Sequence, residues 1–280
     1  MTAEQHSTGD HPSVIHPTAK IHPTAVLDPS VEVGADVEIG PHCVVGPNVK
    51  IGARSRLIHL VSIVQNTELG EENVLYPGVV IGADPQDRKF AGEPSWVKVG
   101  NHNELREHVT IHRGTSGGGL ETRIGDHCLL MAGAHIAHDC VLGNYVTLAN
   151  QVLLGGHTVF EDHVGVGGHT AFHHFTTVGR FAFIGGFTRV ARDVPPFMIT
   201  EGSPSKVRTI NKVGLRRNDF SEETMQWMKD AHRLLFFEGV VREEAFERLA
   251  EKGPIPPEGE YLFQFMKRSE EGHHGRALQP

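Results

Sequence analysis

The sequence predicts a mainly β fold, a left-handed parallel β-helix of about nine triangular coils, followed by a small α-helical C-terminal domain. Two observations support this prediction. An apolar residue returns at every sixth position over most of the chain, and neither the helical period of about 3.6 nor the strand period of about 2 explains that spacing. The repeat stops near Arg192, and the sequence beyond it shows helical spacing of apolar residues.

The apolar positions form two long runs with a short one between them. They occur at every sixth residue from Ile15 to Ile81, again at Val99, Leu105 and Ile111, and at every sixth residue from Ile124 to Val190, which makes 27 positions. Three hexads make one coil of 18 residues, so 27 hexads give nine coils. Stacked strands lie about 4.8 Å apart. Residues 18 positions apart are therefore expected to be neighbours.

Two further positions of the hexad are restricted. The residue after the apolar one is often glycine, which permits a backbone approach that a side chain would obstruct. The fourth residue after it is small or β-branched and is expected to point inward. Cys43, Cys128 and Cys140 all occupy this fourth position, so we interpret them as buried structural thiols.

The repeat sets the expected domain boundaries. Residues 1–13 are polar and are expected to form a disordered tail. Residues 14–207 are expected to form the β-helix, with loops at 84–98 and 112–123 where the repeat is interrupted. A structured loop such as 84–98, inserted into a solenoid, commonly binds a ligand. The second loop is rich in glycine, a composition that simple flexibility also explains.

The C-terminal part, residues 208–272, is expected to be a helical domain. Its helical patterns cover 221–238, 242–251 and 261–271, and Ser221 is the expected N-cap of the first. Helices packed over the end of a solenoid protect its open strand edges. The last residues, 273–280, are expected to be frayed.

Composition argues against several classes of protein. The formal net charge of −8 is unfavourable for general nucleic-acid binding. The sequence shows neither a signal-peptide pattern nor an apolar run long enough to span a membrane, so no integral membrane segment is expected. Three cysteines are too few for a disulfide framework, and a reducing, cytoplasmic location fits best.

Coil stacking gathers histidines. We expect a column of imidazoles on the outside of the prism, flanked at its lower end by a histidine and a carboxylate: His138, His157, His173 and His174, with His135 and Asp139 beside them. Three interpretations remain open. The column could be a polar ladder at a surface or subunit interface, a metal site, or a general base supported by neighbouring groups.

Motifs for other kinds of catalysis are missing from the sequence. It contains no reactive-cysteine context, no GxGxxG dinucleotide fingerprint and no P-loop. This favours direct group transfer without a covalent intermediate. Gly155 and Gly156, next to His157, could offer a backbone N–H to a developing oxyanion.

Several segments resemble one family in detail. The sequences PQDRKFAGEP (85–94), TIHRGT (110–115), HIAHDC (135–140) and NKVGLRR (211–217) closely resemble the UDP-N-acetylglucosamine 3-O-acyltransferases of lipid A synthesis. The resemblance extends from about Ile15 to Met266. The hexad alone would indicate only the wider hexapeptide superfamily, whereas these motifs together are more specific.

The resemblance implies an enzyme, its substrates and the roles of particular residues. It implies a homotrimer that takes an (R)-3-hydroxyacyl chain from acyl carrier protein and transfers it to UDP-N-acetylglucosamine, with no cofactor or metal of its own, since the 4′-phosphopantetheine arrives on the carrier. His138 matches the general base, Asp139 its orienting carboxylate and Gly156 the oxyanion donor. Residues that match substrate contacts are Asp87, Lys89, His135, His157, His173, His174, Asn211 and Arg217.

Two positions depart from the family pattern and leave the acceptor open. His174 stands where the family usually has Gln, and Val213 where it usually has Glu. We nevertheless expect an acceptor that carries a 3-hydroxyl, and the 3-amino sugar is the alternative. The related N-acyltransferase of the same pathway is a further alternative, although it normally carries an N-terminal uridine-binding domain. Gly186 matches the position that limits acyl length, and glycine there predicts a long chain.

Overall fold

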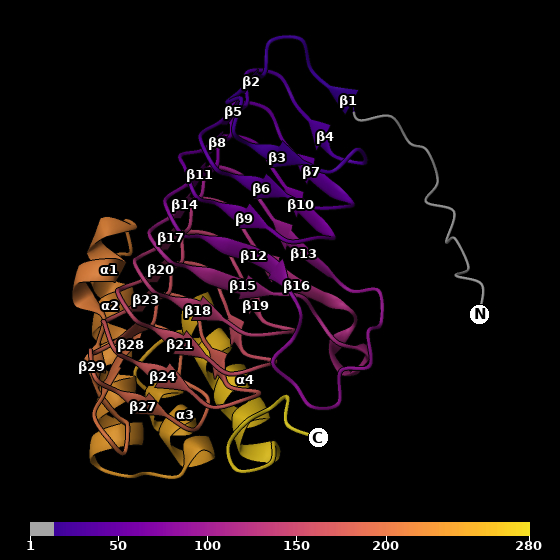
Figure 1. Ribbon diagram of the computed structural model, residues 1–280. Coiled ribbons are helices and arrows are strands. Elements are labelled where there is room, and N and C mark those ends of the chain that lie inside the picture. Colours follow the sequence, from indigo (N-terminus) through magenta and orange to yellow (C-terminus); the bar gives the residue numbers. More distant parts are fainter. Residues whose placement is uncertain (1–13) are drawn as a thin grey trace.

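The computed structural model describes residues 14–280, and its main body is a three-sided prism of stacked coils with helices packed at its C-terminal end (Figure 1). The disordered tail expected for residues 1–13 lies outside the described residues. Each coil contributes one short strand to each of three parallel sheets, here called A, B and C. Strands β1–β27 complete the nine expected coils, and β28 extends sheet B into a partial tenth. The predicted fold class is confirmed.

The strands have the following bounds. Sheet A contains β1 (Val14–Ile15), β4 (Glu32–Val33), β7 (Val49–Ile51), β10 (Thr67–Leu69), β13 (Trp96–Val99), β16 (Glu121–Ile124), β19 (Val141–Leu142), β22 (Val159–Phe160) and β25 (Thr177–Val178). Sheet B contains β2 (Lys20–Ile21), β5 (Glu38–Ile39), β8 (Arg56–Leu57), β11 (Val74–Leu75), β14 (Glu104–Leu105), β17 (Leu129–Leu130), β20 (Thr147–Leu148), β23 (Gly165–Val166), β26 (Phe183–Ile184), β28 (Met198–Glu201) and β29 (Lys206–Ile210). Sheet C contains β3 (Val26–Leu27), β6 (Val44–Val45), β9 (Ser62–Ile63), β12 (Val80–Ala83), β15 (Thr110–His112), β18 (His135–Ile136), β21 (Leu153–Leu154), β24 (Ala171–Phe172) and β27 (Arg189–Val190).

The hexad residues fill the interior of the prism. From Val33 onward the apolar hexad positions are buried, and the small residues between them, including all three cysteines, are buried with them. Burial raises the pKa of Cys128 and Cys140 to about 11, so these thiols stay protonated and unreactive near neutral pH. Ile15 remains 42% exposed, since the first described coil has a neighbour on one side only.

The glycine of the hexad has the steric role that the sequence predicts. A Cβ atom on Gly40 would lie 1.7 Å from the carbonyl oxygen of Ile58 in the next coil, closer than any real contact. At the corners between strands, non-glycine residues adopt the left-handed backbone conformation, as Asp139 (φ 61°) and His157 (φ 61°) do. Non-glycine residues rarely adopt this conformation, so the stacked backbone must enforce it.

Both loops are shorter than predicted. The first spans 84–95, because β13 already begins at Trp96, and the second spans 113–120, because β16 begins at Glu121. These two strands pair with each other over four residues, from Trp96 opposite Glu121 to Val99 opposite Ile124. The ends of the loops are thereby drawn into sheet A. A short 3-10 turn, η1 (Ser116–Gly118), lies within the second loop.

The helical domain starts later and contains more elements than predicted. β29 crosses the expected boundary at 207/208 and pairs antiparallel with β28, which covers the edge of sheet B. Its helices are α1 (Lys212–Arg217), α2 (Glu222–His232), the π-helical turn η2 (Arg233–Phe237), α3 (Arg242–Ala250) and α4 (Pro257–Glu271). The N-cap prediction is confirmed, since the Ser221 hydroxyl accepts the Thr224 N–H at 3.0 Å. α4 begins four residues earlier than expected, with proline in its first turn.

The C-terminal segment is packed rather than frayed. The N–H of Asp193 donates to the Gly275 carbonyl at 2.8 Å, and the N–H of Ala277 donates to the Asp193 carboxylate at 2.8 Å. The Arg276 side chain is 5% exposed and donates to the Ala191 carbonyl. These contacts hold the segment against the last coil. None of the helices in residues 14–280 combines the length and the apolar character needed to cross a membrane.

Replacing Arg276 with Met tests this C-terminal contact. The change removes a charge-assisted hydrogen bond and leaves the half-buried Ala191 carbonyl without this donor, which costs about 2 kcal/mol. We expect the thermal unfolding temperature to fall by about 4 to 8 °C. Lys20→Met, which breaks an exposed ion pair with Glu38, is the control and should change it little. Equal unfolding temperatures for the Arg276 variant and wild type would show that the segment adds nothing to stability.

Candidate functional site

The candidate site lies at the corner of the prism between sheets C and A. Each coil turns this corner between two strands, as between β18 and β19. Because Ile136 is in register with Leu154 and Phe172, two stacked rows follow at the corner. One row contains His138, Gly156 and His174, and the next contains Asp139, His157 and Phe175. The expected single column of imidazoles is therefore two adjacent rows.

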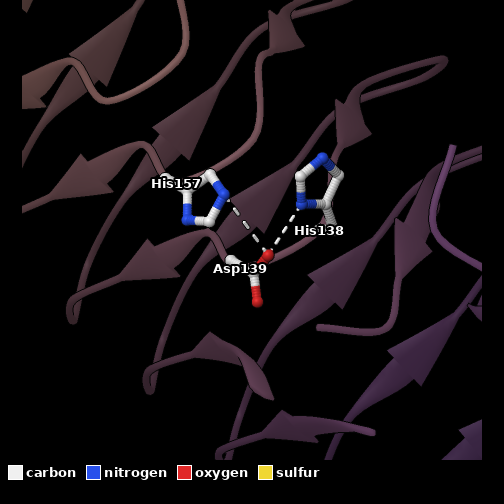
Figure 2. A group of neighbouring side chains, drawn as sticks. All are labelled: His138, Asp139 and His157. Carbon is white, nitrogen blue, oxygen red and sulfur yellow. Dashed lines mark hydrogen bonds and ion pairs between the residues drawn. The ribbon is translucent and has the colours of Figure 1, made fainter. Parts of the chain in front are cut away.

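A buried carboxylate stands between two imidazoles at this corner (Figure 2). The Asp139 Oδ2 atom lies 2.7 Å from His138 Nδ1 and 3.6 Å from His157 Nε2. The Asp139 side chain is 1% exposed and that of His138 8%. These side chains lie at the corner, outside the coil interior, but Asp139 is shielded from solvent because Thr115 and Gly118 of the second loop lie against it.

Hydrogen bonds keep Asp139 ionised despite its burial. Burial itself disfavours the charge, but hydrogen bonds from His138 and Thr115 hold the pKa of Asp139 below its usual value. The Thr115 N–H donates to Oδ1 at 2.7 Å and the Thr115 hydroxyl to Oδ2 at 2.6 Å. An ionised carboxylate can only accept, so His138 Nδ1–H is the donor of the third bond. This tautomer leaves the lone pair of His138 on Nε2, where it can take a proton.

Burial disfavours charge on the surrounding imidazoles. It lowers the pKa of His157, His112 and His174, and it lowers that of His135 to about 4. His135 Nδ1 lies 2.7 Å from the Thr110 hydroxyl, and its ring meets that of His112 at 5.1 Å. His135 is thus close to the corner, on the outer side of β18.

Gly156 and Phe175 shape the corner around the two histidines. A Cβ atom on Gly156 would lie 2.6 Å from His138 Nε2, so only glycine leaves room for the imidazole there. The Phe175 ring stacks on His157 at 4.5 Å. Phe175 is not among the residues predicted from the sequence, although it lies 18 residues after His157 and the repeat places it there.

The first loop brings one predicted residue toward this corner. The Asp87 carboxylate acts electrostatically on both His157 and His174, so it faces the same region. Asp87 also accepts the N–H of Lys89 at 3.0 Å, and the Lys89 side chain is exposed. The Glu93 carboxylate accepts the N–H groups of Ala91 and Ser116 at 2.9 and 3.0 Å, which ties the two loops together.

The remaining predicted residues lie at the edge of the site or away from it. His173 directs Nδ1 to the carbonyl of His174 at 3.0 Å and is exposed. Asn211 is the N-cap of α1, accepts the Gly214 N–H and donates to the Phe181 carbonyl, at the corner between sheets A and B. Arg217 is exposed at the end of α1. Within one protomer, none of the contacts among residues 14–280 joins Asn211 or Arg217 to His138.

The corner has side chains that could bind a metal ion, but the carboxylate oxygens among them are already hydrogen-bonded. His138, Asp139 and His157 each offer a ligand atom, and these atoms lie within 4.8 Å of one another. However, both oxygens of Asp139 already accept hydrogen bonds from Thr115, and Oδ2 also accepts one from His138. A metal ion would have to displace these donors. The arrangement is better suited to proton transfer through His138.

Comparisons with known proteins agree on one family. A family profile described as "Udp N-acetylglucosamine O-acyltransferase; Domain 2" matches residues 193–274, and one described as "Bacterial transferase hexapeptide (six repeats)" matches 12–47 and 121–156. The protein named acyl-acyl-carrier-protein–UDP-N-acetylglucosamine O-acyltransferase from Rippkaea orientalis is 50% identical over 213 residues, 76% of each chain. Its namesake from Thermodesulfovibrio yellowstonii is 44% identical over 221 residues, 79% of this chain and 86% of that one.

Solved structures agree with the sequence comparisons. The crystal structure of a UDP-N-acetylglucosamine O-acyltransferase from Moraxella catarrhalis superposes with a TM-score of 0.82 at 40% identity. The match covers 87% of this chain and 95% of that one. The likeness therefore includes both the prism and the helical domain.

The buried imidazole of His135 predicts a pH-dependent loss of stability. In the unfolded chain a histidine binds a proton near pH 6.5, whereas folded His135 does so near pH 4. Between these values the unfolded state binds more protons, so stability falls as pH falls from about 6.5 toward 4. A ¹⁵N NMR titration should find the His135 ring neutral at pH 5.5, its signal being identified by its loss in His135→Gln. Between pH 7 and pH 5, the thermal unfolding temperature of His135→Gln should fall less than that of wild type. Protonation of the His135 ring near pH 6.5 would contradict this.

Proposed function

The chain belongs to the UDP-N-acetylglucosamine O-acyltransferase family and is an acyltransferase, and we propose that it transfers an (R)-3-hydroxyacyl chain from acyl carrier protein to the 3-hydroxyl of UDP-N-acetylglucosamine. This would be the first acylation of lipid A synthesis, carried out in the cytoplasm. The observation that best supports the proposal is the buried His138–Asp139 pair, whose 2.7 Å hydrogen bond leaves Nε2 as the proton acceptor.

The proposed reaction needs one base and one oxyanion donor. His138 Nε2 takes the proton of the sugar hydroxyl as its oxygen attacks the thioester carbonyl. The tetrahedral oxyanion accepts a hydrogen bond from the Gly156 N–H, which has no partner among the described residues. When the C–S bond breaks, the thiolate of the 4′-phosphopantetheine arm leaves and takes the proton back from His138. The enzyme returns to its starting state, and no cofactor of its own is required.

The neighbouring residues have proposed binding roles. His135, His157 and His174 are kept largely neutral by burial and suit hydrogen bonds to a sugar or nucleotide. The exposed Lys89 suits a phosphate, and Asp87 a sugar hydroxyl. His173 and Arg217 are exposed and remain candidates for donor or nucleotide contacts. For Asn211 a binding role has less support, because its amide already holds α1 on the prism.

We propose a homotrimer with sites between neighbouring prisms. Val141, on β19 directly after the His138 segment, and Leu153, on β21 beside β18, are 38% and 48% exposed. Apolar side chains exposed beside an active corner support self-association there. Of the basic residues that could receive the acidic carrier protein, Arg208 and Arg216 already pair with Glu201 and Glu222. Arg189, Lys206 and Lys212 remain exposed for that contact.

Replacing the base tests the proposed mechanism. With a 3-hydroxyacyl carrier protein and UDP-N-acetylglucosamine as substrates, His138→Ala should lower kcat at least about a thousandfold, since general-base catalysis is lost. His163→Ala is a matched control, because His163 stacks between Tyr145 and Phe181 at another corner. Equal activity of wild type and the His138 variant would mean that the base is misassigned. Transfer to the 3-amino sugar alone would move the proposal to that acceptor.

Gly186 tests the proposed acyl length. Its missing side chain leaves the space toward Gly168 open, where a Cβ atom would lie 3.1 Å from the Gly168 carbonyl oxygen. We expect wild type to use long 3-hydroxyacyl donors, and Gly186→Met to shift the preference in kcat/KM toward short donors by at least about tenfold. Donors of graded length, compared in competition, measure this preference. A wild type that accepts only short chains would exclude the proposal.

A further inference from the structure

Thr115 makes two of the three hydrogen bonds that Asp139 accepts. Its N–H donates to Oδ1 at 2.7 Å, and its hydroxyl donates to Oδ2 at 2.6 Å. Thr115 is itself 5% exposed, so both bonds are shielded from water. It belongs to the second loop, not to the coils, and among residues 14–280 its N–H and its hydroxyl both donate to the carboxylate beside His138.

The second loop is fitted to this carboxylate. A Cβ atom on Gly118 would lie 2.1 Å from the Asp139 Cγ atom, so the glycine lets the loop backbone close over the carboxylate. On the side of the preceding coil, the Thr122 hydroxyl on β16 accepts the Asp139 N–H at 2.8 Å. The loop is anchored on the other side by Arg113, which donates to Ser95 and Asp84 of the first loop. Its glycine-rich sequence thus forms an ordered cover.

Asp139 has two competing partners. Oδ2 lies 2.7 Å from His138 Nδ1 and 3.6 Å from His157 Nε2, so a small rotation of the carboxylate would exchange one histidine for the other. With both oxygens bound to Thr115, the carboxylate is fixed in the orientation that contacts His138. Without the hydroxyl, only the bond from the Thr115 N–H to Oδ1 restrains it.

We propose that Thr115 is a positioning residue of the transferase: by fixing the Asp139 carboxylate, its hydroxyl directs that group to His138 rather than His157 and selects the His138 tautomer with a free Nε2. This rests on the proposed function in taking His138 as the base. Thr115 acts through Asp139 and need not touch either substrate. Its loss should therefore change kcat and leave the KM values for both substrates within about twofold.

Three variants test the role of the hydroxyl. Thr115→Val keeps the shape and the backbone bond but removes the hydroxyl, and kcat should fall about 10- to 100-fold, the value of one hydrogen bond to a charged group. Thr115→Ser retains the hydroxyl and should recover most of the activity. Thr67→Val makes the same change at a buried threonine whose hydroxyl donates to the Gln65 carbonyl, away from the site, and should keep wild-type kcat.

A double-mutant cycle separates positioning from a general structural effect. In an Asp139→Asn background, Thr115→Val should lower kcat no more than about twofold further, because the two residues act as a unit. An undiminished 10- to 100-fold loss in that background would overturn the proposal. So would wild-type kcat in folded Thr115→Val. If that variant does not fold, Thr115→Ala replaces it in the same cycle.

NMR gives a readout that does not depend on the substrate. The ¹⁵N shifts of the His138 ring should report one tautomer, protonated at Nδ1, in wild type and Thr115→Ser, and a mixture in Thr115→Val or Thr115→Ala. An unchanged tautomer in the variants would refute the positioning role. If the variants show a mixture of tautomers but wild type fails to acylate UDP-N-acetylglucosamine, the positioning role is supported and the proposed function is rejected.

Discussion

The backbone hydrogen bonds between successive coils are the constraint on which the rest of the structure depends. They hold a register of 18 residues, so that the His157 N–H donates to the His138 carbonyl at 3.1 Å and the Phe175 N–H to the Gly156 carbonyl at 3.1 Å. The same bonds hold Asp139 and His157 in the left-handed region. Groups from three coils are therefore placed at one corner before any side chain interacts with another.

Stacking alone, however, would leave that corner open to water. A carboxylate on an open corner is solvated and only weakly coupled to its neighbours, whereas a buried one interacts strongly but must be paired and hydrogen-bonded. The second loop supplies both conditions for Asp139, since it covers the side chain and contributes Thr115 as donor. The interruption of the repeat thus gives this corner the buried, hydrogen-bonded carboxylate that the proposed proton transfer needs.

The sequence predicts the repetitive part of the molecule well and the inserted part poorly. A fixed period gives the coils and the buried cysteines, since each coil obeys the same local rule. It gathers the histidines at one corner, although they form two rows rather than the expected single column. The contact between Thr115 and Asp139 crosses an insertion that has no period, so no spacing could reveal it. The C-terminal segment was likewise missed, because the burial of Arg276 depends on the carbonyl of Ala191, 85 residues earlier. Asn211 shows a further difficulty, since a cap and a binding residue look alike in sequence.

The corner also shows how one imidazole is selected from several. His112, His135, His157 and His174 all lie in this region, and burial lowers the pKa of each. Residue type alone would not show which of these four histidines and His138 is the base. Contact does: among the described residues, His138 has a nitrogen within hydrogen-bond distance of the ionised Asp139, while that of His157 lies 3.6 Å away. A carboxylate stabilises the imidazolium it touches more than one it merely approaches. In the proposed mechanism, the choice of base would therefore depend on a difference of less than an ångström between the two contacts of Asp139, and the loop rather than the coils would set it.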